Sequence, residues 1–250
     1  LSGDARAGPG MSAAAAPPAN AGRRAAPLPP RAAYRLWAPA YEEETAISFV
    51  DDRLVAALTP PLGGLRLLDA GCGTGRRLRR IDGAALAAGA DLTWEMLAAG
   101  ASAASGPPPL LAAADVRALP FAFAGFDVVW CRLVVGHLPD PVPAYAELAR
   151  VCAPGGTVVV TDFHPDAARA GHTRSFRDAE GTLHDVEHHV HSLDDHLTAA
   201  ETAGLTLIER RDGVIDDALR PFYARAGRLD RFARDEGLAV VLALSFRRGP

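Results

Sequence analysis

The chain has 250 residues, of which 49% are hydrophobic and 22% are charged, and its formal net charge is −4. A chain of this length and composition is typical of a globular protein with one domain, which can bury a sizeable core without disulfides or a structural metal. The acidic balance argues against a nucleic-acid partner, and the longest apolar run is about half the length of a membrane span.

The three cysteines, Cys72, Cys131 and Cys152, are odd in number and widely spaced. This pattern fits neither a disulfide framework nor a C-x-x-C zinc site, so we expect no metal and a reducing, cytoplasmic location. The chain contains no lysine and is rich in alanine, arginine, glycine and proline, a bias typical of a bacterial genome of high GC content.

The N-terminal part predicts a tail followed by two helices. Residues 1–30 contain an alanine run and several prolines with almost nothing large and apolar, so a disordered tail is predicted. From residue 31 on, Tyr34, Trp37 and Tyr41 recur at the spacing of one helical face. A second helix is predicted over residues 47–58, where a Thr-Pro-Pro sequence follows.

The middle of the chain alternates between short apolar strands and helical segments. Strands are predicted at 65–69, 86–91, 126–131 and 157–162. Three helices are predicted: one starting over residues 74–80, one that follows the strand at 86–91 and extends through Met96, and one over 143–151. This alternation predicts an α/β fold with a parallel, doubly wound sheet.

The last third begins with a predicted β-hairpin, whose strands at 173–178 and 182–191 flank a short turn. Ser192 and Asp195 have the spacing of a capping box, which predicts a helix that ends before a glycine at 204. Two further apolar strands are predicted at 205–209 and 239–246.

A glycine loop at residues 67–75 (LLDAGCGTG) is the strongest functional signal. A buried strand leads into glycines at alternate positions, which let the backbone approach a ligand closely. The spacing is G-x-G-x-G, whereas dinucleotide enzymes use G-x-G-x-x-G. Asp91 closes the next strand, where a carboxylate can accept hydrogen bonds from ribose hydroxyls. Asp69, before the loop, could accept from a cationic group such as an ammonium.

Seven motifs follow one another in order: 69–75 (DAGCGTG), 90–97 (ADLTWEML), 114–116 (ADV), 119–121 (LPF), 126–129 (FDVV), 137–140 (HLPD) and 148–156 (LARVCAPGG). From about Tyr34 to the C-terminus the chain resembles class I S-adenosylmethionine-dependent methyltransferases, in the small-molecule branch similar to quinone-biosynthesis C-methyltransferases. The resemblance implies a Rossmann-like, seven-stranded, mostly parallel sheet flanked by helices, in one domain over 31–250. It also implies lid helices over 31–60 and a β-hairpin insertion over 165–192 that covers the active site.

The resemblance implies S-adenosylmethionine as cofactor, and it implies a set of contacts. The methionine and ribose are surrounded by Asp69, Gly71, Cys72, Gly73 and Gly75, the ribose hydroxyls are bound by Asp91, and the methionine end is lined by Cys131 and Arg132. The adenine ring lies between Leu92 and Met96, and its edge is bound by Asp115 and the Val116 N–H. The lid is formed by Tyr41 with Tyr34 and Trp37. Simple core packing remains an alternative for the aromatic stripe, Cys72 and Met96, and a solvated turn remains one for Asp115.

Methyl transfer from a sulfonium is an in-line displacement, in which the protein positions the acceptor, excludes water and removes a proton where needed. His137 is the first candidate base, although Gly136 stands where the resemblance has a second histidine. Asp162 and His164, after the next strand, form a possible carboxylate–imidazole pair. The alternatives are a hydrogen bond from His137 to its loop and a turn cap by Asp162.

Seven of the eight histidines lie within a short span, residues 164–196: His164, His172, His184, His188, His189, His191 and His196. Strand alternation sends neighbouring histidines to opposite faces, which argues against a shared metal site. One or two of them could face a substrate from the hairpin, or all could be solvated.

The predicted function is transfer of a methyl group from S-adenosylmethionine to an O, N or C acceptor of a small molecule. The GC-rich bias favours a bacterial secondary metabolite, such as an antibiotic intermediate. The alternatives are a non-catalytic methyltransferase-like binding module and a quinone C-methyltransferase of primary metabolism. We expect a monomer or homodimer without nucleic-acid or membrane partners.

Overall fold

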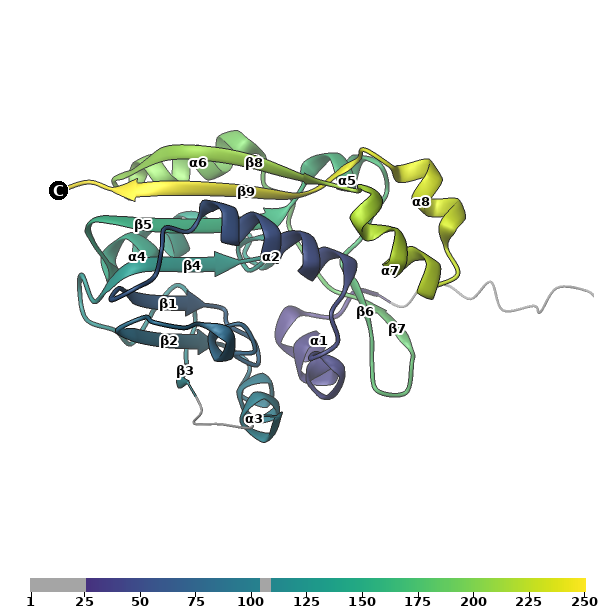
Figure 1. Ribbon diagram of the computed structural model, residues 1–250, viewed down its shortest axis with the longest axis horizontal. Helices are drawn as coiled ribbons and strands as arrows, with labels where there is room; N and C mark the ends of the chain where they lie inside the picture. The colour runs from purple at the N-terminus through teal and green to yellow at the C-terminus, as the bar shows by residue number, and fades with distance from the viewer. Residues whose placement is uncertain (1–25, 104–108) are drawn as a thin grey trace, which may run out of the picture.

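The computed structural model describes residues 26–103 and 109–250, so most of the predicted tail, residues 1–25, lies outside the described residues. Its centre is a seven-stranded sheet (Figure 1) with the order β3-β2-β1-β4-β5-β9-β8. The strands are β1 Arg66–Ala70, β2 Leu86–Asp91, β3 Leu110–Ala113, β4 Phe126–Arg132, β5 Cys152–Phe163, β8 Leu205–Val214 and β9 Ala239–Arg248. Only β9 runs antiparallel to its neighbours, β5 and β8. The expected mostly parallel, Rossmann-like α/β sheet is confirmed.

Helices cover both faces of the sheet. The helix α2, Ala46–Leu58, packs on one face, and α4, Val142–Val151, and α6, Leu193–Thr202, pack on the other (Figure 1). In β4, Val128 contributes to the core on the α2 side and Val129 to the core on the α4 side, because successive strand residues point to opposite faces. Burial on both faces explains why the strands read as continuous apolar runs.

The helix predicted over residues 74–80 is not formed, apart from a short 3₁₀ turn, η2, at Leu78–Arg80. Its arginines instead bond to neighbouring segments: Arg76 donates to backbone carbonyls of residues 41–43, and Arg77 donates to Asp52 at 2.5 Å. These side-chain bonds fix the segment as a turn between β1 and β2.

Six elements have no counterpart in the sequence-based prediction: β3, the 3₁₀ turns η3 at Val135–His137 and η4 at Asp217–Leu219, and the short helices α5 Pro165–Arg169, α7 Arg220–Arg225 and α8 Leu229–Asp235. They have between three and seven residues, which is too short for an apolar periodicity to stand out. The helix α3, Trp94–Ala103, lies where a helix through Met96 was predicted.

The capping box that opens α6 is formed as predicted. The Ser192 hydroxyl accepts a hydrogen bond from the Asp195 N–H at 3.2 Å, and the Asp195 carboxylate accepts from the Ser192 N–H at 2.7 Å. Gly204, just beyond the helix, has a φ of +73°, a left-handed conformation that favours glycine.

A two-stranded hairpin lies outside the main sheet and packs against the first helix. Its strands are β6, Ser175–Arg177, and β7, Leu183–Asp185, both shorter than predicted. Phe176 and Val186 share a small buried cluster with Ala33 of α1, Pro30–Trp37 (Figure 1). Leu28 forms a parallel bridge with Val186, so the N-terminal segment and the hairpin are tied together.

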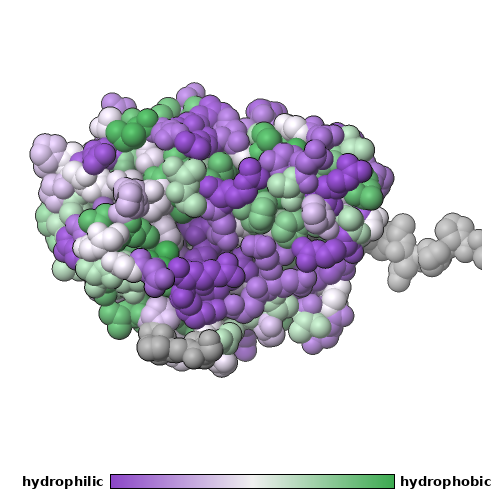
Figure 2. Space-filling model, viewed as in Figure 1, coloured by the Kyte–Doolittle hydropathy of each residue, from purple (hydrophilic) through white to green (hydrophobic). Residues whose placement is uncertain are grey.

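The surface carries both hydrophilic and hydrophobic residues. On the face shown in Figure 2, hydrophilic residues form a broad band, and hydrophobic residues are scattered around it. Among the residues that the structure describes, no helix is both long enough and apolar enough to span a bilayer.

Candidate functional site

A cavity of about 560 Å³ lies at the carboxyl ends of β1, β2, β4 and β5 and is bounded by α1 and the hairpin. Open α/β sheets bind their ligands at this edge. The cavity brings together eleven of the sixteen residues predicted for the site: Tyr41, Asp69, Gly71, Gly73, Asp91, Leu92, Met96, Asp115, Val116, Arg132 and His137.

The glycine loop keeps one end of this cavity open. Gly71 and Gly73 have φ values of +89° and +58°, which side chains rarely adopt. A Cβ on Gly71 would lie 2.1 Å from the Val134 side chain, and one on Gly73 would lie 3.1 Å from Tyr41. Gly75 also has a positive φ, but it faces Leu111 and does not line the cavity.

Asp91 joins the glycine loop to the end of β2. Its carboxylate accepts a hydrogen bond from the Gly73 N–H at 2.8 Å and another from the Thr93 N–H at 2.8 Å. Burial raises the pKa of Asp91, while these two N–H donors oppose the rise. Each carboxylate oxygen keeps a lone pair for a further donor, such as a ribose hydroxyl.

Asp69 provides a buried acceptor with no protein partner. Its side chain is 2% exposed, and its Oδ1 has no hydrogen-bond partner among the described residues. Burial raises the pKa of Asp69 to about 6, although Arg132 and Arg77 pull it down. Since buried polar atoms are normally bonded, this oxygen on the cavity wall fits a ligand cation such as the ammonium of S-adenosylmethionine.

The part of the cavity predicted to bind adenine is apolar, but the Asp115 carboxylate there is already bonded to a protein side chain. Met96 and Val116 are buried and Leu92 is exposed, and all three line the cavity. Asp115 lines it too, but its carboxylate accepts bonds from the Arg117 side chain at 2.6 and 3.0 Å. These bonds lower the pKa of Asp115, so a ligand amine would share this carboxylate with Arg117.

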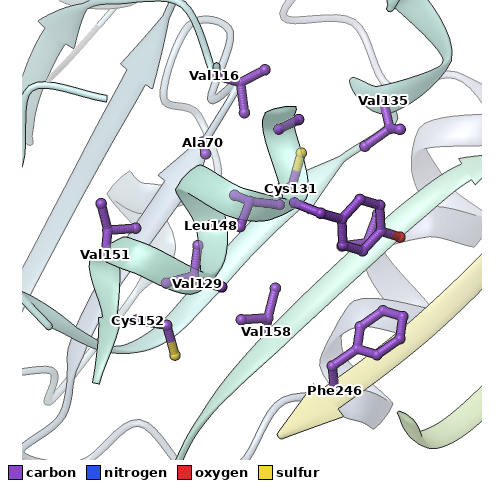
Figure 3. Close-up of a cluster of buried hydrophobic side chains, with 14 of the residues drawn as sticks. Ala70, Val116, Val129, Cys131, Val135, Leu148, Val151, Cys152, Val158 and Phe246 are labelled. Atoms are coloured by element: carbon purple, nitrogen blue, oxygen red, sulfur yellow. The ribbon is translucent and has the colours of Figure 1, made fainter. Parts of the chain in front are cut away.

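Cys72 and Cys131 do not reach the cavity, which corrects their predicted cofactor contacts. Cys131 precedes Arg132 in β4, so the two side chains point to opposite faces and only Arg132 lines the cavity. Figure 3 shows the Cys131 sulfur in the core near Ala70, Val135 and Leu148. Cys72 packs in the core on the α2 side. Burial raises the pKa of both thiols, so both are packing residues.

Arg132 is held by a buried ion-pair cluster. Its guanidinium donates to Asp51 at 2.7 and 3.1 Å and also contacts Asp52. Asp51 is fully buried and accepts a further bond from the Thr161 hydroxyl at 2.6 Å. Arg77 donates to Asp52 from the other side. The cluster fixes α2 against the carboxyl ends of β4 and β5 beside the cavity.

Tyr34 and His137 lie together in the wall of the cavity. The His137 Nε2 lies 2.9 Å from the Tyr34 hydroxyl, and its Nδ1 lies 3.3 Å from the Glu187 carbonyl oxygen. Because a carbonyl only accepts, Nδ1 carries the proton and Nε2 accepts from Tyr34. Burial, helped by the charge of Arg174, lowers the pKa of His137 to about 3, and burial raises that of Tyr34 to about 12. Both groups are therefore neutral.

Asp162 and His164 do not pair with each other, and neither lines the cavity, which corrects that prediction. The His164 Nδ1 accepts from the Asp166 N–H at 3.0 Å and so caps α5. Asp162 is buried, and its Oδ2 lies 3.5 Å from the His196 Nε2. A Cβ on Gly136 would lie 2.5 Å from the Asp162 Oδ1, so a histidine at position 136 would displace this carboxylate.

None of the seven histidines at positions 164–196 lines the cavity, although Thr173, Arg174, Ser175 and Val186 of the same segment do. His184 bonds to Asp178, His191 bonds to the Leu138 carbonyl, and His196 lies buried 2.9 Å from the Tyr145 hydroxyl. Over residues 26–103 and 109–250, no group of three histidines, cysteines or carboxylates is arranged to hold a metal ion.

Arg174 lines the cavity. From the sequence it could bind an acidic group of a substrate, but it could not be distinguished from a surface cation, because arginine is the default surface cation in a chain without lysine. Its Nη2 donates to the Leu133 carbonyl at 2.7 Å, and its Nη1 lies 4.0 Å from the Asp162 Oδ1. The only sequence signal for Arg174 is its place in the predicted insertion.

Comparisons with known proteins agree with this geometry. Residues 68–160 match the family model of a methyltransferase domain. The chain is 28% identical over 213 residues to 27-O-demethylrifamycin SV methyltransferase from Amycolatopsis mediterranei, with 81% of this chain and 75% of that protein covered. It is 38% identical over 109 residues to a demethylmenaquinone methyltransferase from Roseiflexus castenholzii, with 42% and 44% covered, so this match spans less than half of that relative.

Among solved structures, an S-adenosylmethionine-dependent methyltransferase from Mesorhizobium loti superposes with a TM-score of 0.63 at 24% identity, covering 80% of this chain and 98% of that one. This likeness shows that the two proteins share a fold. The matched domain holds the glycine loop, Asp91 and Asp115, which line one end of the cavity. Residues 68–160 therefore form a methyltransferase domain, the chain resembles small-molecule S-adenosylmethionine-dependent methyltransferases, and this likeness indicates S-adenosylmethionine as the methyl donor.

Proposed function

We propose that the protein transfers a methyl group from S-adenosylmethionine to a small-molecule acceptor that binds beside Tyr34 and His137. The observation that carries this proposal is one continuous cavity, which joins the glycine loop and Asp91 to the Tyr34–His137 pair. When bound, S-adenosylmethionine supplies an electrophilic methyl carbon, so the protein needs to align the acceptor and exclude water.

In this proposal the chain holds the methyl donor through groups that line the cavity. Asp91 accepts from the ribose, and Asp69 accepts from the ammonium group. Leu92 and Met96 contact the adenine, and Asp115 and the Val116 N–H contact its edge. The proposed lid, residues 31–60, and the proposed roof, residues 165–192, close the acceptor end, where α1 packs against the hairpin.

His137 is proposed as a positioning group and not as a strong base. With a pKa lowered to about 3 by burial, it binds a proton weakly at neutral pH, but its Nε2 still accepts a hydrogen bond from Tyr34. The pair can therefore orient an acceptor at a fixed distance from the methyl carbon.

The proposed acceptor is a bacterial secondary metabolite, in line with the high-GC composition and the likeness to a rifamycin methyltransferase. A quinone of primary metabolism is the second candidate, favoured by the likeness to a demethylmenaquinone methyltransferase. The proposed location is the cytoplasm, in line with three cysteines that are free and buried. The proposed oligomeric state is a monomer or homodimer.

Isothermal titration with S-adenosylmethionine and S-adenosylhomocysteine tests the donor half of the proposal. We expect both to bind at a ratio of one per chain and NAD to show no binding. A chain that binds NAD and neither of the adenosyl compounds would contradict the proposed function. Methyl transfer to none of a panel of quinones, phenols, alcohols and amines, despite donor binding, would favour a non-catalytic module.

The raised pKa of Asp69 predicts that donor affinity depends on pH. The carboxylate form binds the ammonium, and this group takes up a proton in the free protein as the pH falls through about 6. The affinity for S-adenosylhomocysteine should be level above that pH and should fall as the pH decreases below it. Methylthioadenosine, which lacks the ammonium, is the matched ligand and should show no such fall in calorimetry. An equal fall for both ligands would contradict the assignment.

A further inference from the structure

Arg174 places a fixed positive charge in the wall at the acceptor end of the cavity. Its side chain comes from the segment before β6 and is 13% exposed. The Nη2 is bonded to the Leu133 carbonyl, whereas the Nη1 has no hydrogen-bond partner among the described residues. The Nη1 atom is buried, and the Arg174 side chain also interacts with the Tyr34 hydroxyl. A buried donor without a hydrogen-bond partner is costly, so this N–H group would bind a ligand oxygen that reached it.

Three other arginines that line the cavity are paired with carboxylates: Arg132 and Arg77 bond to Asp51 and Asp52, and Arg117 bonds to Asp115. Arg76 also lines the cavity and donates to the backbone carbonyls of residues 41–43. The nearest carboxylate to Arg174, that of Asp162, is 4.0 Å away. The charge of Arg174 is therefore less neutralised than the charges of the three paired arginines, and Arg174 lines the same cavity as Tyr34 and His137.

The charge of Arg174 discriminates between classes of acceptor. An amine that is protonated in water would bring a second cation to this wall, and like charges in a partly buried site repel strongly. A negatively charged oxygen would instead form a charge-assisted hydrogen bond with the free Nη1.

The neutral state of His137 also favours an acceptor oxygen that is already negatively charged. A phenol ionises with a pKa of about 10, as tyrosine does, so proton transfer from a phenol to an imidazole whose pKa is lowered by burial is unfavourable. An acceptor that arrives at the methyl carbon already ionised avoids this transfer. Aromatic side chains from two elements, Tyr34 and Trp37 of α1 and Phe163 of β5, line the cavity and favour a planar ring.

We propose that the acceptor is a phenol bound as its phenolate, with Arg174 as the residue that binds the reacting oxygen. This inference rests on the proposed methyltransferase function and names its substrate class. The phenolic proton is released to solvent on binding. The phenolate oxygen then forms a bond to the methyl carbon while the carbon–sulfur bond breaks and leaves its electron pair on sulfur, so that the two opposite charges cancel.

The test uses para-nitrophenol, because its anion has a distinct absorption band. The full-length protein, saturated with S-adenosylhomocysteine, is titrated at a pH about one unit below the probe's pKa in water, where about a tenth of the free probe is ionised. We expect most of the bound probe to show the phenolate band. Para-nitroaniline, which has the same shape and no acidic hydroxyl, should bind at least about tenfold more weakly.

Three variants assign the band to Arg174. Arg174→Gln should abolish it, and Arg174→Lys should retain part of it, since lysine keeps the charge. Arg177→Gln removes an exposed arginine of β6 that lies outside the cavity, and it should leave the band unchanged. The affinity for S-adenosylhomocysteine should stay within about twofold throughout, which also reports that each variant is folded.

The outcomes separate this inference from the proposed function. If S-adenosylhomocysteine binds and para-nitrophenol binds in its neutral form, or not at all, the phenolate proposal is overturned while the methyltransferase function stands. An equal phenolate band in wild type and Arg174→Gln, or tighter binding of para-nitroaniline, also overturns it. If Arg174→Gln fails to fold, the phenolate band of the wild-type protein and its partial loss in Arg174→Lys still test the phenolate proposal. Failure of the wild-type protein to bind S-adenosylhomocysteine overturns both.

Discussion

The variant Asp91→Ala is expected to lower the affinity for S-adenosylmethionine by more than about a hundredfold. The change removes two carboxylate oxygens proposed to accept from ribose hydroxyls, and hydrogen bonds to charged groups contribute about 1.5–3 kcal/mol each. It also removes the partner of the Gly73 N–H, which holds the glycine loop in place. Calorimetric titration with S-adenosylmethionine measures the loss.

Asp91→Asn is the matched control, because its amide keeps one accepting oxygen and nearly the same volume. We expect it to lose about tenfold in affinity, less than alanine does. Thermal unfolding followed by circular dichroism separates lost binding from lost structure. Wild-type affinity in a folded Asp91→Ala protein would show that the ribose is bound elsewhere.

Asp51→Ala is expected to lower the free energy of unfolding by about 3–5 kcal/mol, since removing one partner from a buried ion pair leaves the other charge uncompensated. Asp51 is fully buried and accepts from Arg132 and from the Thr161 hydroxyl, so the change leaves donors on two strands without their partner. Denaturation with urea, monitored by circular dichroism, gives the difference from wild type.

The control for this prediction is a neighbouring ion pair on the surface. Arg53 and Asp216 are 3.1 Å apart with side chains 53% and 39% exposed, and exposed pairs contribute about 0–1 kcal/mol. Arg53→Ala should therefore change the free energy of unfolding by less than about 1 kcal/mol. Similar losses in the two variants would contradict the view that burial of Asp51 makes its pair important.

The sequence was sufficient to predict the parts of the protein that depend on local patterns. Apolar runs that alternate with helical segments indicated the sheet, and Ser192 with Asp195 indicated the start of α6. The glycine loop was recognisable because its spacing reflects a backbone conformation that only glycine adopts freely, as the φ values of Gly71 and Gly73 show. Ten of the thirteen residues predicted to contact the methyl donor line the cavity, whereas Cys72, Gly75 and Cys131 do not.

The acceptor end could not be predicted in the same way, because it depends on contacts between distant segments. The partner of His137 is Tyr34, which is 103 positions away, and no local pattern links them. Asp162 and His164 suggested a pair by proximity in sequence, but β5 ends between them and His164 turns to cap α5. Arg174 has no motif around it, and its role depends on where the hairpin folds back.

The bridge between Leu28 and Val186 lies outside the seven-stranded sheet, and so do Tyr34 and Arg174. Residues of these covering segments can therefore be exchanged without altering any strand of the sheet or the glycine loop. Natural selection, or a laboratory library confined to these two segments, can therefore change which acceptor the protein binds while its use of the methyl donor stays the same.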